Sequence, residues 1–152
     1  MNLEKYQQYS RIARGLEKAD LVLKDARIVN VFTEEIIRGD IAIQDGIIAG
    51  IGSFHGKEER DLAGRYVCPG FIDSHLHLES TLVTPAELVT VASRHGTTTF
   101  IVDPHESANV SGLAGIDYIL DQTEDVKANV YVMMPSCVPA TAIDDNGCTL
   151  TA

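Results

Sequence analysis

The sequence predicts an α/β protein that begins with a small antiparallel sheet and continues as a parallel α/β fold. Two observations predict it. From residue 67 onward, apolar β-type segments alternate with amphipathic helical segments, the order typical of parallel sheets. Before residue 67, short β-branched runs surround Asp45-Gly46, a strong signal for a β-hairpin. We therefore divide the chain into an N-terminal helix (1–18), a β segment (19–66) and an α/β segment (67–152).

Composition narrows the class of protein. The chain has 152 residues, of which 45% are hydrophobic, so an extended disordered chain is excluded. It carries 22 acidic and 12 basic side chains, a net charge of −10, which argues against a nucleic-acid or anionic membrane partner. The N-terminus is too polar for a secretory signal, and no apolar run approaches the roughly 20 residues that span a bilayer. The three cysteines match no zinc or CxxC pattern, so we expect reduced thiols and a cytoplasmic location.

In the first third of the chain, each expected element rests on a local pattern. Apolar residues at helical spacing predict the helix, and β-branched runs predict the strands. In Asp45-Gly46, both residues suit the positive φ angles of a type I′ turn. A run of charged residues before position 61 suggests a surface loop. The expected elements are a helix at 3–18, short strands at 21–23 and 27–32, a hairpin centred on 45–46, and a charged loop at 55–60.

The remaining chain alternates strand and helix. Pro85 suits the first turn of a helix and Gly96 suits its end, with a buried-looking strand on either side. The last residues are loop-like. The expected elements are strands at 71–77, 97–102 and 129–134, helices at 84–95 and 111–122, and a loop from 135 to 152.

His75 and His77 are the most informative pair in the sequence. Residues two apart in a strand point to the same face, so both imidazoles are able to reach one metal ion. Leu76 and Leu78 then point the other way, into packing. The spacing alone also fits two polar residues at a strand end. The position favours a site, because parallel α/β folds carry their chemistry at the C-terminal ends of strands.

The residues around this pair resemble a known superfamily. Residues 67–77, VCPGFIDSHLH, are similar to the first barrel strand of the amidohydrolase superfamily. Three further stretches, at 77–85, 103–110 and 135–141, resemble the bacterial adenine deaminases within it. The resemblance implies the N-terminal part of a metal-dependent (β/α)8 TIM-barrel hydrolase, preceded by part of a small β-sandwich domain.

The same resemblance implies a reaction and a cofactor. Adenine would be hydrolysed to hypoxanthine and ammonia by a metal-activated water, and His75 and His77 would bind a divalent metal. A binuclear manganese or iron centre is favoured over zinc, in a full-length enzyme that is a homo-oligomer. The catalytic aspartate and the other ligands would lie beyond Ala152. Since a (β/α)8 barrel needs roughly 250 residues, we expect the 152-residue chain alone to be inactive.

Three other residues are candidates for the site. Glu79 follows the ligand pair and has three possible roles: orienting a ligand histidine, facing the substrate, or lying on the surface near a helix N-terminus. His105 and Glu106 follow the next strand, where they would hydrogen-bond a purine edge or shuttle protons. Asp103-Pro104 alone has the character of a plain loop start.

Other histidines and one aspartate are not assigned to the metal site. His55 lies in the charged loop and His95 at a helix end, so both are excluded from the site. Asp73 precedes the ligand pair on the same face, where a turn or capping role would support the strand end. Two alternative functions remain: another cyclic amidohydrolase of the superfamily, or a non-catalytic truncated remnant that binds metal weakly.

Overall fold

The computed structural model describes residues 2–151, which form two compact units with a boundary between Pro69 and Gly70. Each unit has its own sheet and its own hydrophobic clusters. Among the described residues, no helix is both long and apolar enough to cross a membrane.

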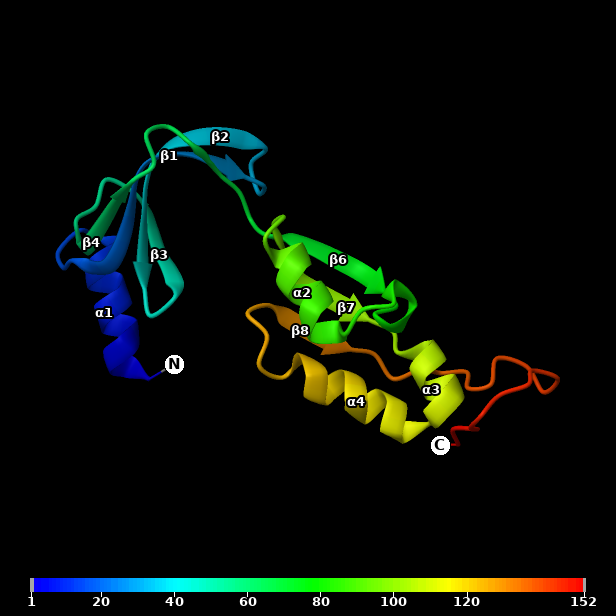
Figure 1. Cartoon of the computed structure of the whole chain (residues 1–152). Coiled ribbons are helices and arrows are strands. Elements are labelled where there is room, and N and C mark those ends of the chain that lie inside the picture. The colour runs from blue at the N-terminus through cyan, green and yellow to red at the C-terminus, as the bar shows by residue number, and fades with distance from the viewer. Residues whose placement is uncertain (1, 152) are drawn as a thin grey trace. The chain divides into compact units, whose positions relative to one another are not determined.

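The first unit is a mixed five-stranded sheet with one helix (Figure 1). The strand order is β3-β2-β1-β4, and the short β5 pairs with the end of β1. Strands β1, β2 and β3 are antiparallel neighbours, whereas β4 and β5 run parallel to β1. The elements are α1 (Leu3–Ala13), β1 (Ala19–Asn30), β2 (Glu35–Gln44), β3 (Ile47–Gly52), β4 (Gly56–Asp61) and β5 (Tyr66–Val67).

The predicted hairpin is confirmed, while the predicted helix was too long. Asp45 and Gly46 both have positive φ angles, 52° and 76°, and join the paired residues Gln44 and Ile47. This is the backbone that a two-residue type I′ turn requires. Helix α1 ends at Ala13 rather than at residue 18, because the chain turns at Gly15, whose φ is +71°.

Two further predictions for this unit were wrong. The expected short strands 21–23 and 27–32 are one strand, β1, with an irregularity between Leu23 and Ala26. The expected charged loop 55–60 is largely strand β4, so the sheet is mixed rather than antiparallel. Its side chains are exposed after Gly56, and charged side chains are well suited to a sheet edge that faces water.

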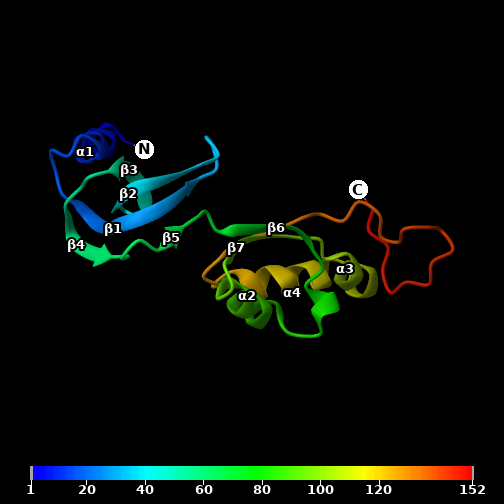
Figure 2. The same ribbon diagram turned by 90° about the horizontal axis from the view of Figure 1, so that it is seen from above.

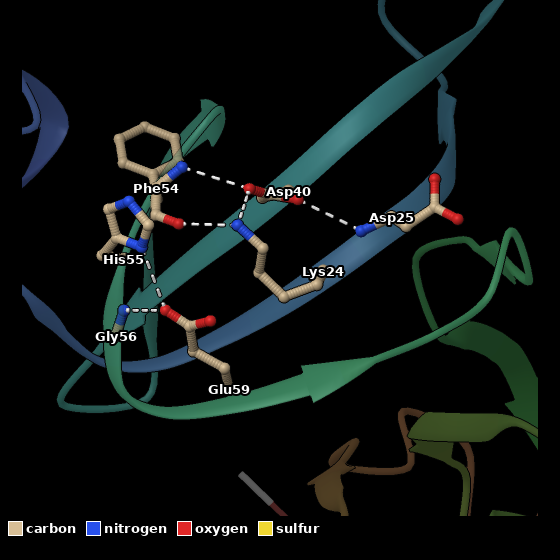
Figure 3. Close-up of polar contacts among 7 residues, drawn as sticks. All are labelled: Lys24, Asp25, Asp40, Phe54, His55, Gly56 and Glu59. Carbon is tan, nitrogen blue, oxygen red and sulfur yellow. Dashed lines mark hydrogen bonds and ion pairs between the residues drawn. The ribbon is translucent and has the colours of Figure 1, made fainter.

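Asp40 joins three segments of the first unit (Figure 3). Its Oδ2 accepts hydrogen bonds from the Lys24 ammonium at 2.5 Å and from the Phe54 backbone N–H at 3.1 Å. Its Oδ1 accepts the N–H of Asp25 at 3.1 Å, where β1 is irregular. Lys24 also donates to the Phe54 carbonyl at 2.8 Å. The carboxylate thus ties the irregular part of β1 to the β3–β4 connection.

The second unit is a three-stranded parallel sheet, ordered β6-β7-β8, with helices in the connections. Figure 2 shows α2 and α4 on the same side of this sheet. The elements are β6 (Phe71–Leu76), η1 (Glu79–Thr81), α2 (Pro85–Ser93), β7 (Thr97–Val102), α3 (His105–Ser111), α4 (Leu113–Thr123) and β8 (Asn129–Val132).

The core of the second unit lies between its sheet and its helices. Val89 of α2 and Ile119 of α4 pack with Phe100 and Val102 of β7, and Leu78 is fully buried among them. Leu76 is partly buried in the same cluster. The expected inward direction of Leu76 and Leu78 is therefore confirmed.

The helices after β7 differ from the prediction. Helix α3 was not predicted, and the expected helix 111–122 starts later, as α4. The cause is Gly112, whose φ of +61° separates the two helices. A Cβ at Gly112 would also lie 2.5 Å from Cys148 Sγ, which is too close.

Candidate functional site

The register between β6 and β7 determines which side chains meet beyond the strand ends. Leu76 pairs with Val102, and the next backbone hydrogen bond runs from the N–H of Asp103 to the carbonyl of Leu76 at 2.9 Å. Both paired residues pack toward the helices. Because side chains alternate along a strand, His77 and Asp103 follow them on the opposite face.

His75, His77 and Asp103 form a compact group of donor atoms. The Nε2 atoms of the two histidines lie 3.1 Å apart. Each of the three residues offers one ligand atom, and these atoms all lie within 4.8 Å of one another. Asp103 Oδ1 is buried and has no hydrogen-bond partner among residues 2–151. Two imidazoles and an unpartnered carboxylate oxygen are donors that suit a divalent cation.

A second set of contacts extends from His77 to Glu79 and Glu106. His77 Nδ1 lies 2.9 Å from Glu106 Oε2, at the start of α3. Glu79 Oε1 accepts the backbone N–H groups of Glu106 at 3.0 Å and Ser107 at 3.2 Å. Glu79 is therefore near a helix N-terminus, but it is partly buried rather than on the surface. Its Oε2 is buried and has no hydrogen-bond partner in the described part of the chain.

The environment shifts the pKa values of the two glutamates in opposite directions. Burial raises the pKa of Glu79, and the neighbouring Glu106 carboxyl group raises it further. Burial also acts to raise the pKa of Glu106, but contacts with Glu79 and His77 outweigh it and leave this pKa below its ordinary value. Glu106 is therefore the member of the pair that ionises first, which suits an acceptor for the His77 ring N–H.

The structure does not bring every candidate residue into these groups. His77, Glu79 and Glu106 form a second group of donor atoms within 4.8 Å of one another. His105 belongs to neither of the two groups found among residues 2–151. His105 is the first residue of α3 and is partly buried. Asp73 supports the strand end, since its Oδ1 accepts the His75 backbone N–H at 3.3 Å.

The residues excluded from the site are also outside these groups. His55 belongs to the first unit, where its Nδ1 lies 3.3 Å from Glu59 Oε1, and His95 is exposed after α2. Cys68, Cys137 and Cys148 are free thiols.

Asp103 is the member of the first donor group that the sequence did not single out. Its sequence context, Asp103-Pro104 after a strand, looks like an ordinary loop start. Its position was the one useful sign. Asp103 directly follows strand β7, just as His77 directly follows the neighbouring strand β6. That signal becomes decisive only when the register of β6 against β7 is known.

Known sequences similar to this chain belong to one family of enzymes. Residues 66–151 match the amidohydrolase family. The whole chain is 56% identical to an adenine deaminase of Desulfitobacterium hafniense and covers 27% of that protein. It is 52% identical to the adenine deaminase of Geobacillus kaustophilus, over 89% of this chain and 23% of the relative. The chain thus spans about a quarter of the length of the curated relatives it matches.

A solved structure provides a comparison of folds. The N-acyl-D-glutamate deacylase of Bordetella bronchiseptica was solved with zinc and a phosphonate inhibitor. The structural match covers 77% of this chain and 29% of the deacylase chain. The TM-score is 0.58 at 23% sequence identity. This similarity supports a shared fold and carries no information about the substrate.

Proposed function

Because the chain belongs to the amidohydrolase family, we propose that it is the N-terminal segment of a metal-dependent adenine deaminase. The complete enzyme would convert adenine and water to hypoxanthine and ammonia. The observation that carries this proposal is the convergence of His75, His77 and Asp103 at the C-terminal ends of two parallel strands, in a segment similar to an adenine deaminase along its whole length.

The proposed ligands in this segment are His75, His77 and Asp103. Their donor set fits a divalent cation, since the buried Oδ1 of Asp103 otherwise has no partner among the described residues. A divalent cation bound there would supply Lewis acidity that makes a water nucleophilic near neutral pH. We propose a binuclear manganese or iron centre in preference to zinc, with the remaining ligands beyond residue 152.

The other candidate residues would act around this centre. Glu106 accepts the His77 Nδ1–H and so leaves Nε2 free to face the cation. We propose that His105 and Glu106 also hydrogen-bond the purine edge or move a proton toward the leaving amino group. The aspartate that completes the acid–base step would come from a later part of the enzyme.

The architecture of the complete protein is also a proposal. Strands β6, β7 and β8 would be the first three strands of a (β/α)8 barrel, and strands β1–β5 would be part of a small β-sandwich domain. The parallel order of β6, β7 and β8 supports the barrel, because its strands are all parallel. We also propose that the complete protein is a cytoplasmic homo-oligomer. Its lack of a nucleic-acid or anionic membrane partner fits the net charge of −10 of this chain.

Substrate turnover tests the function. The complete protein, prepared with manganese, should release ammonia from adenine and form hypoxanthine in equal amounts. Turnover of dihydroorotate or hydantoin without turnover of adenine would favour another cyclic amidohydrolase. Metal binding without turnover of any of these would favour a non-catalytic protein. The 152-residue chain, assayed beside it, should be inactive, because the later ligands are missing.

A further inference from the structure

Helix α3 has an unusual N-terminus. The first N–H groups of any helix lack partners within the helix, and a side chain at the preceding position often accepts one of them. Here that position is Pro104, whose side chain forms no such hydrogen bond. Glu79, which lies 27 residues before Glu106, supplies the acceptor instead: its Oε1 accepts the N–H groups of Glu106 and Ser107 at 3.0 and 3.2 Å.

The residue that Glu79 holds by its backbone is the one that contacts the ligand pair. The Glu106 side chain turns toward β6 and places Oε2 2.9 Å from His77 Nδ1. An ionised carboxylate only accepts hydrogen bonds, so this contact puts the proton on Nδ1 and leaves the Nε2 lone pair free. That Nε2 atom lies 3.1 Å from His75 Nε2, so both point toward the same region.

We propose that Glu79 is a positioning residue for the metal centre, acting through the first turn of α3 and Glu106 on His77. This inference rests on the proposed function, since it assumes that His75 and His77 bind a cation. Of the three possible roles of Glu79, the proposal selects the orientation of a ligand histidine. Glu79 does this through Glu106 and not by contacting His77 itself. If Glu79 were itself a metal ligand, its effect would not depend on Glu106.

A double-mutant cycle on metal affinity separates these cases. In the complete protein, the Mn²⁺ dissociation constant is measured by competition with a chelator for wild type, E79A, E106A and the double variant. Loss of an outer hydrogen-bond partner of a ligand histidine typically weakens metal binding about 10- to 100-fold. We expect E106A and E79A each to fall in this range, and the double variant to be no weaker than E106A.

Conservative variants keep the test informative if E79A folds poorly. In E79Q the amide oxygen still accepts both N–H groups, so affinity should remain near that of wild type. In E106Q the charged acceptor is lost, so affinity should fall about 10-fold. Glu87, an exposed acidic residue in the first turn of α2, is the matched control, and E87A should bind Mn²⁺ as wild type does.

The outcomes are distinct. Effects of E79A and E106A that multiply in the double variant would overturn the proposal, as would E79A with unchanged affinity. An E79Q variant as weak as E106Q would also contradict it. If adenine is not turned over but the affinities follow the expected pattern, the proposed function fails while the positioning role of Glu79 stands.

Discussion

Asp40 in the first unit and Asp103 in the second are both shielded carboxylates, yet their surroundings are opposite. Asp40 accepts three hydrogen bonds, from Lys24, Phe54 and Asp25, and its side chain is only 12% exposed (Figure 3). Asp103 has a buried Oδ1 with no hydrogen-bond partner among residues 2–151, and its neighbours are two imidazoles.

The difference indicates what each carboxylate does. A buried polar group whose hydrogen bonds are satisfied by the protein stabilises the fold, whereas an unsatisfied one costs free energy of folding unless a ligand completes it. Asp40 therefore holds the sheet of the first unit together. We propose that Asp103, with His75 and His77, binds a divalent cation, which would complete the unpartnered oxygen.

The largest expected effect is on the ligand pair. In the complete protein, H75A should lose most bound metal and nearly all adenine turnover. Its metal affinity should fall by more than about 100-fold, because loss of an outer partner alone typically costs 10- to 100-fold. Metal content by mass spectrometry and ammonia release measure this. H95A, which changes an exposed histidine outside the group, should behave as wild type, and full metal content in H75A would contradict the assignment.

The next largest effect is on the first unit. D40A removes the ion pair with the Lys24 ammonium, whose side chain is 27% exposed, and the acceptor of the Phe54 and Asp25 backbone N–H groups. The combined loss of these contacts should cost about 3 kcal/mol. Amide hydrogen exchange in β1 and β2 should then lose about 100-fold of its protection. E58A, which removes an exposed ion pair with Arg60, should have little effect. Equal losses in both variants would show that Asp40 has no special role.

Asp103 should respond in the opposite way from Asp40. D103N should weaken Mn²⁺ binding about 10-fold, because a neutral amide replaces the carboxylate ligand. The metal-free D103N protein should keep its melting temperature. Asp103 Oδ1 makes no hydrogen bond with the described residues, so the substitution breaks none at that atom. Calorimetry with and without Mn²⁺ reports both quantities. A metal-free D103N that melts much lower, with unchanged affinity, would make Asp103 a structural residue like Asp40.

The smallest expected effect is a dependence on pH. Burial raises the pKa of Asp40, but the Lys24 ammonium and the backbone N–H groups of Phe54 and Asp25 outweigh it, so the pKa lies below 3.8. A lowered pKa means that the carboxylate contributes stability above about pH 4 and loses it as the pH falls through the folded-state value. The difference in exchange protection between wild type and D40A should therefore narrow below pH 4. A constant difference down to pH 2 would contradict this.

Local patterns in the sequence were enough to find the hairpin and the histidine pair. Asp45-Gly46 needs only its own backbone preferences, and His75 and His77 need only the alternation of one strand. Strand β4 was missed because its charged residues resemble a loop, and only pairing with β1 makes them a strand.

Contacts between distant segments were not readable in this way. Asp103 joins the histidines through the register of two strands, and Glu79 contacts Glu106 and Ser107 across a connection that contains α2 and β7. No local sequence pattern predicts either of these contacts. The sequence therefore predicted features that lie within one strand or turn, and missed those that depend on how distant segments pair.

Anomalous diffraction from bound manganese would show whether His75, His77 and Asp103 form a cation site. Crystals of the complete protein grown with Mn²⁺ would be measured at the manganese absorption edge. We expect a strong anomalous peak within ligand distance of His75 Nε2, His77 Nε2 and an Asp103 carboxylate oxygen. A fully loaded protein whose manganese peaks all lie away from these three residues would contradict it.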